Sequence, residues 1–95
     1  MLYLFLNANN FNQPIGSWNT AKVTDMGHMF QGAIMFNQPI GSWNTINVTS
    51  MSYMFYDANS FNQDIRNWNV TLVTQFDNFA TGSALTTDYI PSKFK

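Results

Sequence analysis

The 95 residues of this chain suffice for one small domain, and 45% of them are apolar, which is enough for a hydrophobic core. Charged residues make up only 9% of the chain, against roughly 25% in typical soluble domains. Four Lys and Arg residues and a net charge of −1 exclude an electrostatic surface for nucleic acid or anionic lipid, and the absence of Cys excludes disulfides and thiolate metal sites.

The first ten residues, MLYLFLNANN, contain a short apolar run. This run lacks a basic n-region and is too short to span a bilayer, so we expect neither a signal peptide nor direct membrane insertion here. Its letters match the last part of a repeat that fills the rest of the chain. We therefore assign residues 1–10 to a partial repeat unit.

The phrase FNQPIGSWNT stands at residues 11–20 and again at residues 36–45, and a diverged copy, FNQDIRNWNV, stands at residues 61–70. The step is 25 residues each time, and a fixed period of this length is typical of a solenoid, whose units pack their apolar sides against one another. We divide the chain, as one domain over residues 1–95, into the partial unit 1–10, the full units 11–35, 36–60 and 61–85, and a C-terminal partial or capping unit 86–95.

The first half of each unit lacks helical character, because its Pro and Gly residues favour an extended or turning backbone. We predict one short strand per unit, at residues 15–19, 40–44 and 65–69. Strands of successive units would run parallel about 4.8 Å apart. Phe would then stack on Phe and Trp on Trp, and the Asn side chains of one unit would bond those of the next.

The second half of each unit predicts a short helix. In the first full unit the apolar residues follow the spacing of one helix face; they are Val23, Met26, Met29, Phe30 and Ala33. We expect helices at residues 24–31, 49–56 and 74–81, capped by the hydroxyls of Thr24, Thr49 and Thr74. The predicted fold class is therefore an α/β repeat solenoid, leucine-rich-repeat-like, with one short parallel strand and one short helix per unit.

The stretch VTDMGHMFQGAIMFNQPIGSWNT, at residues 23–45, resembles a surface-protein repeat of about 25 residues. That repeat occurs in mycoplasma lipoproteins and in Gram-positive wall-anchored proteins of unknown function. The helical half of the unit also resembles the BspA-type leucine-rich repeat. The resemblance implies a leucine-rich-repeat-like solenoid on a bacterial protein that is exposed at the cell surface or secreted. It implies no activity, although adhesion is the usual suggestion for such proteins.

The sequence offers no catalytic or metal-binding constellation. Its single His, His28, aligns with Tyr53 and Asn78 under the period, and a column that accepts all three side chains is expected to be exposed and tolerant. The carboxylates fall in different columns, so no paired acids and no calcium ladder emerge; they are Asp25, Asp57, Asp64, Asp77 and Asp88. We therefore expect no enzyme, and no catalytic, cofactor-binding or metal-binding residue and no cofactor.

The Trp column, Trp18, Trp43 and Trp68, allows two interpretations. Stacked aromatic rings can form a platform for sugar rings. A repeat of this kind also needs large residues in its core, and we favour the core. The same reasoning assigns Met26 and Met29, at helix-face spacing beside Phe, to the core.

Four columns vary between units while their neighbours stay fixed, and we call them the variable columns. They are Lys22/Asn47/Leu72, Asp25/Ser50/Gln75, His28/Tyr53/Asn78 and Gln31/Tyr56/Thr81. Residues that vary on an otherwise constant repeat scaffold can determine which partner is bound. Neutral sequence variation on a solvent-exposed face produces the same pattern.

Two hypotheses of function remain. The first is a non-enzymatic bacterial cell-surface module for adhesion, which binds a host or neighbouring-cell protein or glycan through the face of the solenoid. The alternative is a purely structural spacer or a self-assembling stalk module with no specific ligand. Core residues would be exposed at both ends, notably at residues 2–6, so units of different molecules could stack end to end as a homo-oligomer.

Overall fold

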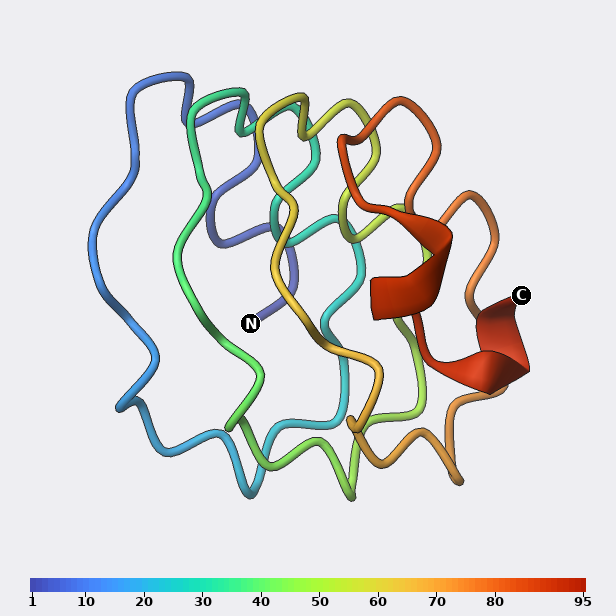
Figure 1. Cartoon of the computed structure of the whole chain (residues 1–95). Helices are drawn as coiled ribbons and strands as arrows, with labels where there is room; N and C mark the ends of the chain where they lie inside the picture. Colours follow the sequence, from blue (N-terminus) through green and yellow to red (C-terminus); the bar gives the residue numbers. More distant parts are fainter.

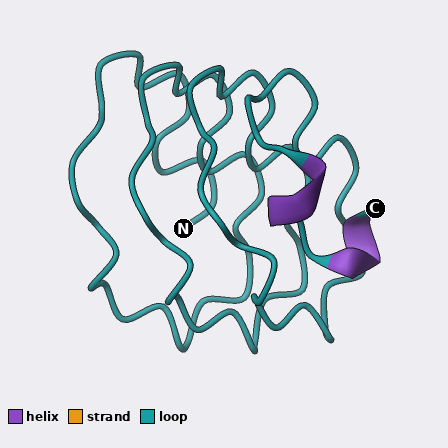
Figure 2. Ribbon diagram, in the orientation of Figure 1, coloured by secondary structure: helices purple, strands orange, loops and turns teal.

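The backbone of each repeat unit forms one irregular loop, and successive loops lie side by side along the molecule (Figure 1). The computed structural model describes all 95 residues. Its helices are two short 3₁₀ turns near the C-terminus, η1 (Thr87–Tyr89) and η2 (Ser92–Phe94) (Figure 2). Pairing of the strand type is limited to two isolated parallel bridges, from Asp25 to Ser50 and from Ser50 to Gln75.

The predicted α/β, leucine-rich-repeat-like solenoid is therefore wrong. The chain is a compact body of 31 × 26 × 19 Å with a Cα radius of gyration of 11.6 Å, and no sheet runs through it. Irregular backbone and turns occupy every segment for which a strand or helix was expected; these are residues 15–19, 40–44 and 65–69 for strands and residues 24–31, 49–56 and 74–81 for helices.

Left-handed residues explain the absence of the helices. In the first full unit, the amide of Met29 donates to the carbonyl of Met26 at 3.3 Å, and His28 between them has φ 57°. A positive φ at the third residue is typical of a type II turn. Gly32, with φ 69°, is likewise the third residue of the turn from Phe30 to Ala33. An α-helix cannot pass through such residues, and turns that begin every two or three residues bury the same apolar side chains.

The amides that point out of these turns bond the next unit. The bonds between the first and second full units join Met26 N to Ser50 O (2.9 Å), His28 N to Ser52 O (2.9 Å), Phe30 N to Met54 O (2.9 Å) and Gly32 N to Tyr56 O (2.8 Å). Every second amide is thus satisfied between units, and the others are satisfied within the turns. The backbone is paired without any helix or sheet.

The Thr column also bonds between units, so its predicted role as a helix cap is wrong. The backbone amide and the hydroxyl of Thr49 both donate to the carbonyl of Thr24, at 2.8 and 3.1 Å. Thr74 repeats both bonds to the carbonyl of Thr49, at 2.9 and 3.5 Å.

Tight turns replace the predicted strands. The amide of Trp43 donates to the carbonyl of Ile40 at 3.1 Å, and the equivalent bond closes each of the other two units. The next unit approaches this turn so closely that a Cβ atom added at Gly41 would lie 2.5 Å from the carbonyl oxygen of Asp64. Gly16 faces Pro39 in the same way, at 2.6 Å. A turn this tight cannot supply an extended strand.

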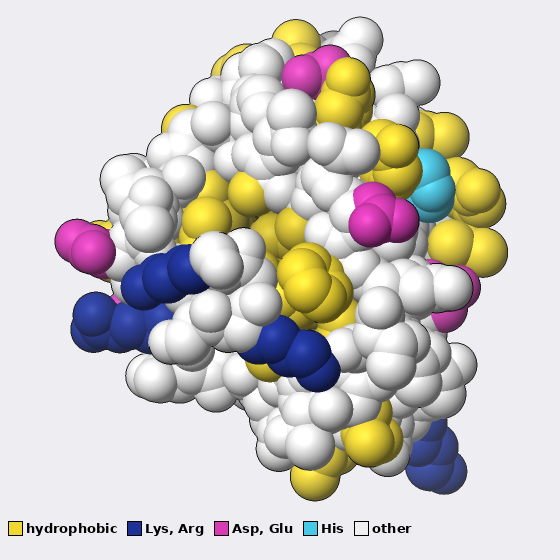
Figure 3. Space-filling view, turned by 90° about the vertical axis from the view of Figure 1, so that its right-hand side faces the viewer, with side chains coloured by type: hydrophobic (Ala, Val, Ile, Leu, Met, Phe, Trp, Pro, Cys, Tyr) yellow, Lys and Arg dark blue, Asp and Glu magenta, His cyan; other side chains and the backbone are white.

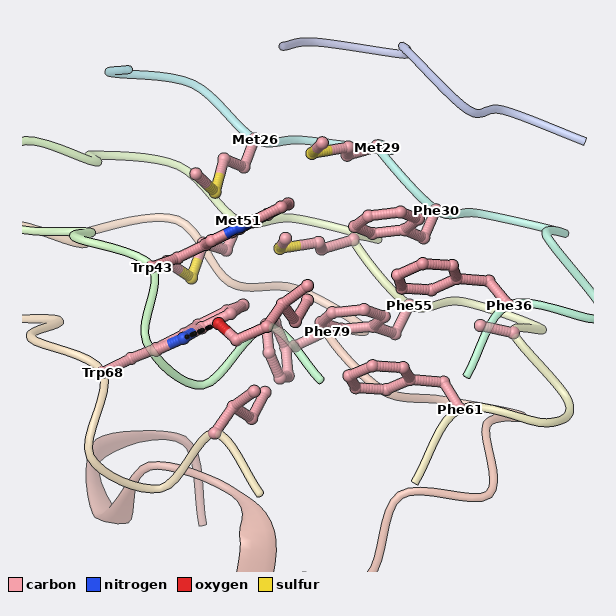
Figure 4. Close-up of a cluster of buried hydrophobic side chains, with 14 of the residues drawn as sticks. Met26, Met29, Phe30, Phe36, Trp43, Met51, Phe55, Phe61, Trp68 and Phe79 are labelled. Carbon is pink, nitrogen blue, oxygen red and sulfur yellow. Dashed lines mark hydrogen bonds between the residues drawn. The ribbon is translucent and has the colours of Figure 1, made fainter. Parts of the chain in front are cut away.

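The core consists of aromatic and aliphatic side chains stacked with the repeat (Figure 4). The predicted stacking of like on like is confirmed by ring-centroid separations of 5.8 Å for Phe36 and Phe61 and 6.3 Å for Trp43 and Trp68, both with nearly parallel planes. The indole of Trp68 donates to the carbonyl of Ile40 at 3.0 Å. Trp43 and Trp68 are each 4% exposed, so their assignment to the core is correct.

Amide side chains link the units at the surface, as expected from the Asn column. The side-chain oxygen of Asn12 accepts the backbone amide of Asn37 at 2.9 Å, and that of Asn37 accepts the amide of Asn62 at the same distance. The side chains of Gln38 and Gln63 donate to the same two oxygens, at 3.1 and 2.9 Å. These bonds hold the register of neighbouring units at the rim of the core.

The C-terminal residues fold back over part of the last full unit. The ring of Phe94 lies 4.6 Å from that of Phe76 and 4.7 Å from that of Phe79. The ammonium of Lys93 donates to the carbonyl of Val70 at 3.1 Å. These contacts place η2 over the apolar end of the core.

Candidate functional site

A column of stacked rings is the most distinctive feature of the surface. The rings of Tyr3 and His28 lie 4.8 Å apart with an interplanar angle of 26°, and those of His28 and Tyr53 lie 5.0 Å apart with an angle of 4°. We call these three residues the aromatic ladder. Tyr3 is 50% exposed, and the other two are partly exposed. The ladder is therefore an accessible surface rather than part of the core.

All three ladder residues have a left-handed backbone, with φ of 60° at Tyr3, 57° at His28 and 58° at Tyr53. Asn78 follows in the same column with φ 52°. Asn tolerates this conformation, whereas bulky side chains rarely adopt it, and each such residue costs about 1 kcal/mol or more. Stacking between the rings offsets part of that cost.

Polar groups lie beside the rings. His28 Nδ1 is 2.6 Å from Gln31 Oε1. The ring of Tyr56 lies 5.4 Å from that of Tyr53 at an angle of 55°. The hydroxyls of Tyr3, Tyr53 and Tyr56 make no hydrogen bond within the chain, so all three can bond a partner or water.

Two of the variable columns thus meet in one surface. The column His28/Tyr53/Asn78 supplies two of the three ladder residues, and the column Gln31/Tyr56/Thr81 flanks them. In the third unit the hydroxyl of Thr81 lies 3.2 Å from Asn78 Oδ1, so a polar pair continues the aromatic surface.

Residues of the other two variable columns form contacts between repeat units. Asp25, Ser50 and Gln75 form the two parallel bridges, and the carboxylate of Asp25 accepts the amide of Gly27 at 2.8 Å. In the column of Lys22, the side chain of Asn47 donates to the carbonyl of the preceding unit, at Ala21, at 2.7 Å.

The sequence interpretation missed Tyr3 as a member of the ladder. Subtracting one period from His28 leads to Tyr3, so the signal was available in the partial unit. It was overlooked because an exposed, tolerant column was not expected to have stacked rings. Trp18, by contrast, is 40% exposed and lies 5.9 Å from the ring of Phe5, at one end of the core.

Two hollows lie at the C-terminal end of the molecule, which faces the viewer in Figure 3. One is a groove of about 540 Å³ that is lined by residues 76–81, Ile90 and Phe94. The other, of about 530 Å³, lies beside Arg66, Asn67 and Lys93. Lys93 already donates to backbone carbonyls, and Arg66 lies 3.3 Å from the carboxylate of Asp64, so neither cation points to a bound anion.

The potential metal-ligating side chains do not form a cluster. No group of three or more His, Asp or Glu side chains could hold a metal ion. The one ion pair joins Arg66 to Asp64, and His28 pairs with Gln31 rather than with a carboxylate. No helix has the length and apolar character needed to cross a membrane.

A family model described as "Mycoplasma protein of unknown function, DUF285" matches residues 1–92. The match supports the mycoplasma part of the resemblance and does not extend to the BspA-type leucine-rich repeat. Comparisons with curated proteins and with solved structures found no match.

Proposed function

The chain belongs to the Mycoplasma protein family of unknown function DUF285, and we propose that it is a non-enzymatic binding module of the cell surface that acts in adhesion. The aromatic ladder carries this proposal. A location at the surface or outside the cell agrees with the mycoplasma repeat that the sequence resembles.

The argument from the ladder begins with its backbone. Tyr3, His28 and Tyr53 occupy left-handed positions at which Asn or Gly would fold with less strain. Asn78 at the fourth position shows that the repeat accepts the relaxed residue. Rings kept at strained, exposed positions favour a role in binding over a role in folding, because strained residues concentrate at functional sites.

The groups that the ladder exposes, which are ring edges and hydroxyls, favour a protein as the partner over a glycan. The ring faces of His28 and Tyr53 cover one another, so edges and hydroxyls are what the surface presents. A sugar ring lies flat on an open aromatic face, and stacking within the ladder occupies both faces of His28 and one face of each Tyr. Tyr edges and hydroxyls are typical anchors of protein interfaces, because they combine a large rigid contact area with hydrogen bonding.

The test compares the native chain with Tyr53→Asn and His28→Asn in binding to host-cell proteins, matrix proteins and glycan arrays. Asn occupies the same column at residue 78, so both variants are expected to fold. Loss of a single interface anchor typically costs about 2 kcal/mol, which is a 30-fold loss of affinity. The control is Leu72→Asn, which changes a 48% exposed side chain outside the ladder.

A protein ligand whose affinity falls in both ladder variants and not in the control would support the proposal. Absence of binding to any cell, protein or glycan would contradict it and would favour the spacer role. Binding that is unchanged by both ladder substitutions would place the contact surface elsewhere.

A further inference from the structure

The two ends of the molecule are covered over opposite halves of the repeat. Residues 1–10 align with the second half of a unit and lie against residues 26–35, as in the bond from Phe5 N to Met29 O of 2.8 Å. Residues 86–95 align with the first half of a unit and lie against residues 61–73, as in the bond from Ile65 N to Tyr89 O of 3.1 Å. Within the 95 residues, no neighbouring loop follows residues 76–82 at the C-terminal end, where the ring of Phe94 packs on Phe76 and Phe79.

The uncovered edges carry complementary backbone groups. Inside the molecule, the third unit accepts a row of bonds from the second: Met51 N to Gln75 O (2.8 Å), Tyr53 N to Asp77 O (2.9 Å), Phe55 N to Phe79 O (2.9 Å) and Asp57 N to Thr81 O (2.9 Å). The corresponding donors one period later have no acceptor within the chain; these are the amides of Phe76, Asn78, Ala80 and Gly82. At the opposite end, the carbonyls of Leu2, Leu4 and Leu6 accept no bond within the chain.

The donor row and the acceptor row match in register. Under the period of 25, Leu2, Leu4 and Leu6 stand where Asp77, Phe79 and Thr81 stand in the third unit. Carbonyls at these positions are the ones that accept the amides of the preceding unit throughout the molecule. Rows of unpaired backbone groups at an edge are templates for pairing with another chain.

The side chains at the two edges are also complementary. The groove of about 540 Å³ at the C-terminal end is lined by Phe76, Phe79 and Phe94, and hydrophobic side chains are visible in the hollow in Figure 3. At the N-terminal end, Leu2, Leu4 and Leu6 are 47%, 50% and 39% exposed. Ala80 replaces the Phe of the earlier units, which leaves room in the groove for an apolar side chain.

We propose that this C-terminal groove binds residues 1–10 of a second copy of the chain. Residues 86–95 of one copy align with the first half of a unit and residues 1–10 of the other align with the second half, so the two segments together supply most of one further loop. The contact joins different surfaces of the two copies, so it repeats from molecule to molecule and builds open linear assemblies. This inference goes beyond the binding role of the ladder and does not depend on it.

The first experiment measures the mass of the native chain by light scattering after size-exclusion chromatography over a range of concentrations. We expect the mass to rise with concentration. Leu4→Lys places a charge in the contact and should weaken association by more than about tenfold. The matched control, Ile46→Lys, alters a side chain of similar exposure (46%) in the central unit and should associate like the native chain. A monomer at all concentrations, or equal effects of the two variants, would overturn the proposal.

The second experiment tests the register. In the docked pair, Tyr3 of one copy follows Asn78 of the other as the next residue of their column, at the spacing of about 4.8 Å between neighbouring chains, and a disulfide can bridge this distance. The native chain has no Cys, so the double variant Tyr3→Cys/Asn78→Cys should form a ladder of covalent oligomers on oxidation. Tyr3→Cys alone should stop at dimers, and the control Tyr3→Cys/Ile46→Cys should form far fewer oligomers. Equal ladders from both double variants would refute head-to-tail docking, even if Leu4→Lys failed to fold.

Discussion

Substituting Gly41 by Ala tests how closely neighbouring units approach one another. The added Cβ atom would lie 2.5 Å from the carbonyl oxygen of Asp64, whereas Cβ atoms essentially never come within 3.0 Å of such a neighbour. The obstacle is backbone rather than a flexible side chain, so the two units must separate locally. Because the turn at this point belongs to a run of inter-unit contacts, the separation should disturb the packing of Trp68 on Trp43.

The expected loss of stability follows from two opposing effects. Overpacking of this kind costs about 1–3 kcal/mol. Removing the flexibility of Gly from the unfolded chain returns about 0.4–1 kcal/mol. The difference is about 0–2.6 kcal/mol. Because the obstacle at 2.5 Å is rigid backbone, we expect the upper part of this range, about 1–2.5 kcal/mol, which lowers the melting temperature of a domain of this size by about 4–20 °C.

The assay is thermal unfolding followed by circular dichroism, with Arg66→Ala as the control. Arg66 occupies the same column in the third unit, where its side chain is 56% exposed and forms only a surface ion pair with Asp64. Its removal should change the free energy of unfolding by less than about 0.5–1 kcal/mol. A Gly41→Ala variant as stable as the native chain, or an Arg66→Ala variant equally destabilised, would refute the reasoning.

Three further substitutions test the core and the links between units, each by chemical denaturation. Phe55→Ala should cost about 3–5 kcal/mol, because Phe55 is fully buried between rings of the neighbouring units; a loss below about 1 kcal/mol would contradict its central place. Trp68→Phe should cost about 1–3 kcal/mol, because it removes the indole bond to the carbonyl of Ile40, which keeps the amide of Trp43, and leaves a small cavity; an unchanged midpoint would show that the indole is dispensable. Asn37→Ala should cost about 0.5–1.5 kcal/mol by removing the acceptor of the Asn62 amide, with hydrogen exchange of that amide as a second readout that should accelerate.

The candidate surface could be predicted only in part. The sequence identified His28 and Tyr53 as members of a variable, exposed column. Their stacking with Tyr3 depends on the left-handed backbone of all three residues, which aligns the rings at 4.8 and 5.0 Å. Asn, Asp and His are enriched in that backbone conformation and Tyr is not, so the two Tyr residues gave no local indication of it.

The predicted helices failed for a related reason. Apolar residues such as Met26, Met29 and Ala33 are spaced alike in a helix and in consecutive turns, so periodicity cannot separate the two. What decides between them is the acceptor of the amides that point outward. The amide of His28 bonds Ser52 in the next unit at 2.9 Å, a contact between residues 24 positions apart.

The sequence by itself determined the neighbours of each core residue. An identical phrase that recurs every 25 residues must adopt the same conformation each time, and equal conformations bury their apolar sides most completely by packing like against like, as Phe36 does on Phe61. Only the tertiary structure decided the path of the backbone within a unit. Hydrogen bonds between units replace those that a helix or strand would make within itself, and such bonds exist only after the units have packed together.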